Sequence, residues 1–206
     1  MARPKAFDTE TALDEAVRLF WERGYEATSI QDLVDALGIH RASLYATFGD
    51  KAQLFEAAIE RYAKQVQAGL AMHLAPPHAG RAAVANYLDA VIEQTTRPGG
   101  PRGCLLLNTA VGCVTAPPAI LERVVASVRH SEEAFHAALG RDKTLARRGD
   151  LRQLARFFAA QAHGLALLGR TGAKAPHLKE AATLSLGVLD RVGSQKPRRR
   201  RRPVGA

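Results

Sequence analysis

Apolar side chains recur every three or four residues along most of the chain, which is the spacing of amphipathic helices. In the first third of the chain this pattern predicts four helices, at 8–23, 30–37, about 40–48 and about 50–72. After Pro76 and Pro77 it predicts five more, at about 80–96, 103–114, 118–139, 150–169 and 177–192. Their separators, among them GRDK and GAKAP, have the composition of turns. No alternating strand pattern persists, so we expect an all-α protein.

The two short helices at 30–37 and 40–48 form the most informative pair in the chain. Gly38 and Ile39 join them, and glycine tolerates the left-handed backbone that a tight turn requires. The first helix carries a buried stripe that includes Leu33 and Leu37, which can hold the second helix at a steep angle. With helix 8–23 packed beneath them, the two helices predict a helix-turn-helix.

The second helix of this pair has an unusual division of side chains. Leu44 and Phe48 fall on one side, where they can pack inward. The remaining surface consists of small or polar residues, namely Ala42, Ser43, Ala46 and Thr47. A helix with such a face can enter a DNA major groove, which is about 12 Å wide, whereas bulky side chains would keep it out.

Several residues around this helix are candidates for direct DNA contacts. Arg41 stands at its start, where recognition residues meet base edges, and it can donate to a guanine or to a phosphate. Phosphate contacts are expected from the N-terminal amides of helix 30–37 and from neighbouring side chains. The complete set of expected DNA-binding residues is Thr28, Ser29, Arg41, Ala42, Ser43, Tyr45, Thr47 and Lys51. Arg3 and Lys5 can add an arm over the DNA backbone.

The block TSIQDLVDALGIHRASLYATFGDKAQLF, which begins at Thr28, resembles the N-terminal DNA-binding domain of the TetR family of bacterial transcriptional regulators. The resemblance covers about residues 8–60. It rests on a Gly-aromatic pair after the first helix, a Thr before the second, a Gly-aliphatic turn and a Leu-Tyr-x-x-Phe-x-x-Lys signature. In this sequence these elements are Gly24–Tyr25, Thr28, Gly38–Ile39, Leu44–Tyr45, Phe48 and Lys51.

The match is not perfect, and some of its residues also allow a purely structural interpretation. His40 occupies the position where the family usually has a Ser or Asn cap, and imidazole is a poorer helix cap. Ala42 replaces a frequent Gly, which is a mild change that favours helix. Tyr45 can alternatively be a core aromatic residue, and Arg41 a solvated surface charge.

The resemblance also implies a domain organisation. A helix-turn-helix DNA-binding domain is expected at 1–50, a linking helix at 51–75 and a helical ligand-binding and dimerisation domain at 76–193. Residues 194–206 are expected to be a disordered Arg-rich tail. The implied function is that of a ligand-responsive repressor, which binds a palindromic double-stranded DNA operator as a homodimer and is released by a small-molecule effector. The effector and its pocket are not identified by the sequence.

The resemblance implies that the last two long helices of two subunits form a four-helix bundle. Their apolar stripes at 151–168 and 178–189 suit that role. The first stripe contains Leu151, Leu154, Phe157 or Phe158, Leu165 and Leu168, and the second contains Leu178, Ala182, Leu186 and Leu189.

Net charge adds little to the prediction of DNA binding. The chain carries 29 Lys and Arg against 20 Asp and Glu, a balance of +9. However, the tail KPRRRRRPVGA holds six of these cations, and residues 1–55 hold six basic against nine acidic residues. The tail can add sequence-independent affinity through counterion release, or it can be a solubilising appendage.

Other classes of protein have weaker support. The N-terminus lacks the apolar region of a signal peptide, and no apolar run approaches the roughly 20 residues of a membrane helix, so a cytoplasmic protein is expected. The histidines show no pair at helical spacing, and no catalytic motif is present. We therefore expect neither an enzyme nor a bound metal or cofactor. A helical small-molecule-binding protein whose helix-turn-helix is only structural remains an alternative.

Cys104 is the candidate for a second kind of regulation. It follows Gly103 at the expected start of a helix, where the helix dipole would lower the pKa of a thiol. Some regulators that resemble the chain here are implicated in sensing electrophiles or oxidants, so Cys104 is a possible thiol sensor. The alternative is a small, buried, apolar residue. Cys113 lies nine residues further on, on the opposite side of one helix, so the two cysteines are not expected to form a bridge.

Overall fold

The computed structural model describes residues 7–100, 102–112 and 118–194, and this part of the chain contains helices and no strands. The all-α prediction is confirmed. The helices of the N-terminal half are α1 (Thr9–Arg23), α2 (Ile30–Leu37), α3 (Arg41–Phe48), α4 (Lys51–Leu74) and α5 (Gly80–Thr96). Those of the C-terminal half are α6 (Leu105–Gly112), α7 (Pro118–Gly140), α8 (Lys143–Arg148), α9 (Leu151–Arg170) and α10 (Ala175–Ser194).

Helix α8 was not predicted. It occupies the segment that begins within GRDK, which the sequence marks as a turn. The Asp142 side chain caps it by accepting hydrogen bonds from the amides of Thr144 and Leu145. A helix of only six residues shows too little periodicity to be recognised, because Leu145 is its only large apolar side chain.

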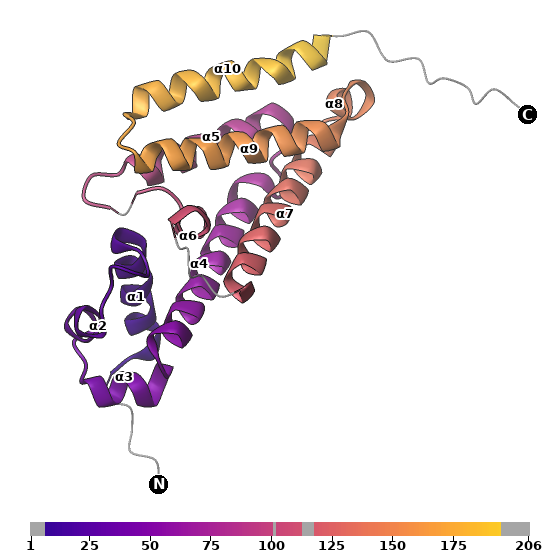
Figure 1. Ribbon diagram of the computed structural model, residues 1–206. Coiled ribbons are helices and arrows are strands. Elements are labelled where there is room, and N and C mark those ends of the chain that lie inside the picture. The colour runs from indigo at the N-terminus through magenta and orange to yellow at the C-terminus, as the bar shows by residue number, and fades with distance from the viewer. Residues whose placement is uncertain (1–6, 101, 113–117, 195–206) are drawn as a thin grey trace, which may run out of the picture.

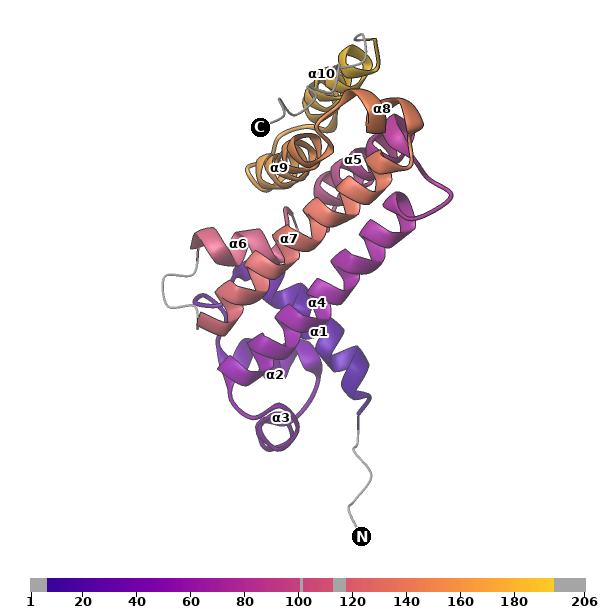
Figure 2. The same cartoon turned by 90° about the vertical axis from the view of Figure 1, so that its right-hand side faces the viewer.

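The molecule has two ends that α4 connects. Helices α1, α2 and α3 form a head around the first half of α4, and α5, α7, α9 and α10 form a body around its second half (Figure 1). In the view turned by 90°, α3 lies at the far end of the molecule from α9 and α10 (Figure 2). The α3 helix is therefore presented at the tip of the head.

Each end has its own hydrophobic core, and α4 contributes to both. Leu54, Phe55 and Ile59 pack in the head core with residues of α1, α2 and α3. Leu70 and Leu74, further along the same helix, pack in the body core. The head core also takes in buried residues of α6 and α7, so packing continues across the expected boundary at residue 50. The position of that boundary stays a prediction.

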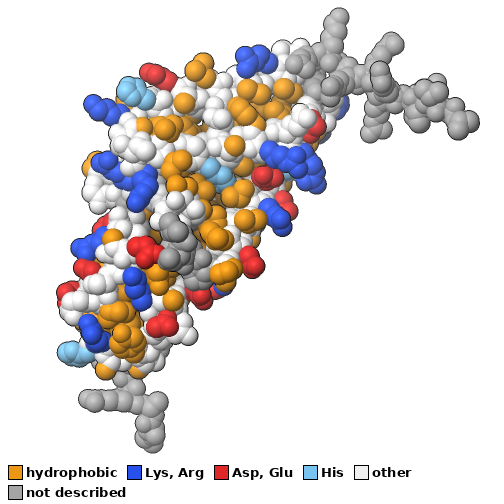
Figure 3. Space-filling model, viewed as in Figure 1, with side chains coloured by type: hydrophobic (Ala, Val, Ile, Leu, Met, Phe, Trp, Pro, Cys, Tyr) orange, Lys and Arg blue, Asp and Glu red, His pale blue; other side chains and the backbone are white. Residues whose placement is uncertain are grey.

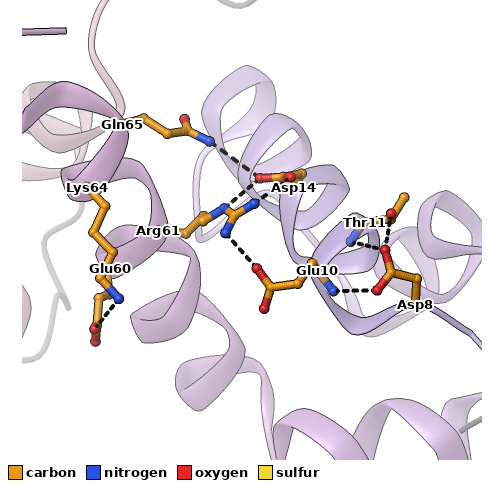
Figure 4. Close-up of polar contacts among 8 residues, drawn as sticks. All are labelled: Asp8, Glu10, Thr11, Asp14, Glu60, Arg61, Lys64 and Gln65. Carbon is orange, nitrogen blue, oxygen red and sulfur yellow. Dashed lines mark hydrogen bonds and ion pairs between the residues drawn. The ribbon is translucent and has the colours of Figure 1, made fainter. Parts of the chain in front are cut away.

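Ion pairs fix α4 to its neighbours on the outside of the core. The Arg61 guanidinium donates to both carboxylate oxygens of Asp14 at 2.9 Å and to Glu10 at 2.6 Å, which joins α4 to α1 (Figure 4). These carboxylates raise the pKa of Arg61, Asp14 most strongly. On the other side of α4, Glu60 pairs with Arg123 of α7 at 3.2 Å. Ion pairs thus join α4 to both α1 and α7.

Most residues of the apolar stripes that were expected to form a subunit interface pack inside the same chain. Leu154, Phe158 and Leu165 of α9 are buried in the body core, as are Leu178, Ala182, Leu186 and Leu189 of α10. Only Leu168 of the expected set is largely exposed, at 49%. For the buried members of these stripes the assignment to a subunit interface is wrong, because other helices of the same chain, α5 and α7 among them, already cover them.

Candidate DNA-binding surface

The turn between α2 and α3 has the geometry that the sequence predicts. Gly38 ends α2 in the left-handed conformation, with φ 63° and ψ 30°, and its amide donates to the Val34 carbonyl. Ile39 follows with only 8% of its surface exposed. Its burial fixes the angle between the two helices, because the side chain is held in the head core. The helix-turn-helix is therefore a packed unit.

Ser29, rather than Thr28, caps α2. Its hydroxyl accepts a hydrogen bond from the Asp32 amide at 3.0 Å, and the Asp32 carboxylate accepts one from the Ser29 amide at 2.9 Å. Asp32 also pairs with Arg23 of α1 at 2.6 Å. The bonds from Ser29, more than the ion pair, lower the pKa of Asp32 to about 2. The start of α2 is thereby fastened to α1.

Thr28 lies beside this cap but faces inward. It is fully buried, and its hydroxyl donates to the Gly24 carbonyl at 2.7 Å. This bond stabilises the chain between α1 and α2. The Thr28 hydroxyl is therefore not presented on the surface, where the sequence led us to expect a DNA contact.

The α3 helix separates an inward edge from an open face. Leu44 is completely buried, and Phe48 is half-buried with its ring 6.4 Å from that of Phe7. We call the outward side the α3 face; it consists of exposed Arg41, Ala42, Tyr45 and Ala46 and half-buried Ser43 and Thr47. Tyr45 is 46% exposed, which excludes the reading of a core aromatic.

His40 is the N-cap residue of α3, and its side chain makes no cap hydrogen bond. The expectation that imidazole caps this helix poorly is confirmed. Amide groups at the start of α3 therefore lack a side-chain partner from the cap position. Next to them, the Arg41 guanidinium lies 3.5 Å from the side-chain oxygen of Gln31, which is at the edge of hydrogen-bonding distance. Gln31 is exposed on α2 and was not among the predicted DNA-binding residues.

Lys51 lies at the opposite border of the α3 face, in the first turn of α4. Its ammonium group stands 4.3 Å from the centre of the Tyr25 ring, a cation–π contact. Asp50 and Gln53 form a capping box at the same helix end. The contact with Tyr25 holds the charge near the surface and leaves the ammonium donors able to bind an anion.

These elements make the α3 face suited to a groove of DNA. Small side chains stand in its centre, while Arg41 and Lys51 place positive charge at either end. The start of α2 adds the partial positive charge of a helix N-terminus. Arg3 and Lys5, expected to form an arm here, lie outside the described residues.

Cys104 does not have the activated thiol that its position suggested. The amides of Leu106 and Leu107 and the hydroxyl of Tyr62 do favour a thiolate, but burial outweighs them and raises the pKa of Cys104. The expectation of a lowered pKa is wrong because the surrounding helices remove the sulfur from water. Cys113 lies outside the described residues, and no group of three or more His, Cys, Asp or Glu in the described part could hold a metal ion.

No helix among the described residues has the length and apolar character needed to cross a bilayer. The apolar residues of the long helices instead pack against one another in the body core.

Known proteins resemble both ends of this chain. Residues 12–58 match the family of bacterial regulatory proteins called the tetR family. The uncharacterized HTH-type transcriptional regulator YezE of Bacillus subtilis is 30% identical over 92% of this chain and 100% of its own. The HTH-type transcriptional repressor ComR of Escherichia coli is 32% identical over 89% of this chain and 90% of its own.

A solved structure extends the similarity to three dimensions. It contains a cysteine mutant of the TetR family transcriptional regulator CifR, complexed with a 26-bp double-strand operator DNA. It aligns with a TM-score of 0.80 at 30% identity, over 91% of this chain and 100% of that chain. The likeness therefore includes the body as well as the helix-turn-helix.

Proposed function

The chain belongs to the TetR family of bacterial regulatory proteins and is a DNA-binding transcriptional regulator, and from this premise we propose that it is a repressor released by a small molecule. The proposal rests mainly on the α3 face, where Arg41 stands next to small, exposed side chains. Leu44 on the opposite side of α3 is completely buried and holds the helix in place. The CifR variant complexed with operator DNA and the repressor ComR support the same direction of regulation.

The α3 helix enters the major groove of the operator in this proposal. Arg41 meets a base edge, and Ala42, Ser43 and Thr47 allow the helix to approach closely. Tyr45, Lys51, Ser29 and the amides at the start of α2 bind phosphates and fix the register. Arg41 is exposed and only loosely joined to Gln31, so its guanidinium is available for a base.

The repressor acts as a homodimer on a palindromic operator. Large apolar side chains are exposed on the outer surfaces of α9 and α10, namely Leu167, Leu168 and Leu184, the last at 78%. Hydrophobic side chains are visible over this part of the body in Figure 3. A second copy covering the same surface would bury them and place two α3 helices on one side of the assembly. The protein works in the cytoplasm, with its DNA.

Effector binding would favour a conformation in which the two heads no longer fit the operator. A ligand achieves this only by binding that conformation more tightly than the DNA-bound one. Helix α4 is the natural connection, because it belongs to both cores and is ion-paired to α1 and α7. An enzymatic reaction plays no part in this mechanism.

The experiment is a selection of genomic fragments by the purified full-length protein, followed by sedimentation of the protein with and without the selected DNA. We expect enrichment of a roughly two-fold symmetric site and a mass of two subunits on it. Placing that site between a promoter and a reporter gene should lower expression when the protein is present. Enrichment without sequence preference would instead favour an architectural DNA binder, and no DNA binding would favour a purely structural helix-turn-helix.

A further inference from the structure

The body contains a cavity of about 180 Å³ that α4, α5, α6, α7 and α9 surround. The described residues that line it include no Lys, Arg, Asp or Glu. Its walls are largely apolar, with Val66, Val91, Leu106, Val124 and Val128 among them. Hydrogen-bonding side chains interrupt these walls, including His73, Tyr87, Gln94, Ser131 and His163.

The size of the cavity restricts what it can hold. A dry apolar cavity of about 150 Å³ in a protein binds a benzene ring. The space here therefore accommodates one ring with a small polar substituent. Aromatic rings stand among its lining residues: Tyr62 and Tyr87 both border the space, and the Tyr87 ring lies 6.3 Å from the His73 ring. Such rings can contact a flat ring of a ligand.

Two titratable groups that line the cavity, His163 and Tyr87, are held in their neutral forms by burial. Burial lowers the pKa of His163, and the carboxylate of Glu132 opposes this only in part. Its imidazole is therefore uncharged near neutral pH, with one donor and one acceptor nitrogen. Burial also raises the pKa of the Tyr87 hydroxyl far from neutrality, so this group stays protonated.

We propose that this cavity is the effector site and that it takes an uncharged molecule of single-ring size with a hydrogen-bond donor and an acceptor. The inference rests on the effector-released repression proposed above and names the chemical class of that effector. An anion or a cation would lose its water without meeting an opposite charge, which is strongly unfavourable. An aromatic amide is a simple representative of the class.

The cavity is linked to the head through one aromatic contact and one hydrogen bond. Tyr62, which lines the cavity, has its ring 4.7 Å from that of Trp21 on α1. The Trp21 indole in turn donates to the Arg102 carbonyl at 3.2 Å, directly before the cavity-lining Gly103 and Cys104. A ligand that moves either wall therefore changes the surroundings of Trp21, the only tryptophan in the chain.

Three probes of equal size test the ligand class on the full-length protein. Benzamide, benzoate and benzylammonium share one ring and differ in charge, and their binding is measured by calorimetry at neutral pH. We expect benzamide to bind at least about tenfold more tightly than either ion, and to change the tryptophan emission in a saturable way. Equal binding of an ion, or no binding by any probe, would overturn the inference.

Two substitutions of Gly69 locate the binding. Gly69 lines the cavity from α4, and a Cβ atom added there meets nothing within 4 Å. Gly69→Phe should fill the space and abolish benzamide binding, whereas Gly69→Ala should retain it. Unchanged binding to a folded Gly69→Phe would place the probe elsewhere and refute the inference. The three-probe comparison decides the ligand class even if that variant does not fold.

Failure of this inference and failure of the proposed function have different signatures. Operator selectivity is measured without any probe, so its absence contradicts the regulatory function itself. Selective operator binding combined with no preference for benzamide contradicts only the effector class.

Discussion

The head and the body offer DNA and small molecules two different kinds of surface. The head presents a convex helix, and the core behind it is filled by large side chains such as Phe20, Leu33 and Leu44. The body encloses unfilled space between five helices. A filled core holds the α3 face in one shape, whereas a cavity allows its walls to move. In the proposed function, DNA recognition therefore belongs to the end with the filled core, and control by an effector belongs to the end with the cavity.

The largest expected effect comes from emptying the core behind the α3 face. Leu44→Ala removes a completely buried side chain, and we expect a loss of about 2–5 kcal/mol in the free energy of unfolding together with loss of operator binding. Thermal or denaturant unfolding measures it. Met72→Ala, at a residue that is 69% exposed in α4, should stay within about 0.5 kcal/mol of the natural protein. Equal losses from both variants would contradict the packing described for the head.

A charge on the body tests the proposed subunit interface. Leu184→Asp should weaken self-association by at least about tenfold, because an unpaired carboxylate would be buried twice in a symmetric dimer. Analytical ultracentrifugation over a range of concentrations gives the dissociation constant. Met72→Asp, an equally polar change at another exposed apolar position, should leave it unchanged. An unaltered dimer of Leu184→Asp would move the interface away from α10.

Arg41→Ala should separate DNA recognition from stability. We expect operator affinity to fall by about 1–3 kcal/mol for each half-site, because a base contact is lost, while the unfolding free energy stays within about 0.5 kcal/mol. Fluorescence anisotropy with labelled operator measures the affinity. Arg147→Ala removes an exposed arginine of α8 in the body and should bind normally. A similar loss from both variants would indicate a general effect of charge.

Ser29→Ala should cost about 1 kcal/mol at neutral pH, since it removes the side-chain cap of α2. It should also raise the pKa of Asp32, which Ser29 holds at about 2. A carboxylate with a depressed pKa stabilises the fold above its unfolded pKa of about 3.9 and loses this contribution as the pH falls toward 2. The stability difference between the two proteins should therefore shrink between pH 4 and pH 2. A constant difference over this range would argue against the bond from Ser29 to Asp32.

The smallest effect is a gain. His40→Ser supplies the cap that α3 lacks and should stabilise the head by about 0.5–1 kcal/mol in unfolding experiments. His40→Ala, which has no cap oxygen either, should match the natural protein closely. A gain from alanine as large as that from serine would mean that capping is not the cause.

The head could be predicted almost entirely from local sequence. Gly38 and Ile39 form the turn between two adjacent helices, and the spacing of Leu44 and Phe48 marks the inward edge of α3, so the local sequence predicts both. The sequence alone does not show whether Thr28 or Ser29 caps α2, because either hydroxyl stands at a suitable position. Burial of Thr28 against α1 settles it, and that contact depends on the tertiary structure.

The body could be predicted only as a set of helices. Its cavity joins residues as distant as Tyr62 and His163, and no periodic pattern relates them. The wrong prediction for Cys104 has the same cause, because it considered only the local helix start, which would lower the pKa of the thiol. Burial by neighbouring helices, which the local sequence does not show, raises that pKa. The same cause applies to the stripes of α9 and α10, whose apolar residues pack against α5 and α7 of the same chain.

The central claim is that sequence-selective binding resides in the α3 face and not in the net charge of the chain. The most direct measurement is the ratio of affinities for the selected operator and for shuffled DNA of the same composition, at one salt concentration. Deleting residues 196–206, which carry six of the 29 cations, should lower both affinities or neither and keep the ratio. Arg41→Ala should reduce the ratio by at least about tenfold. A ratio that survives Arg41→Ala and collapses on deletion of the tail would contradict the account.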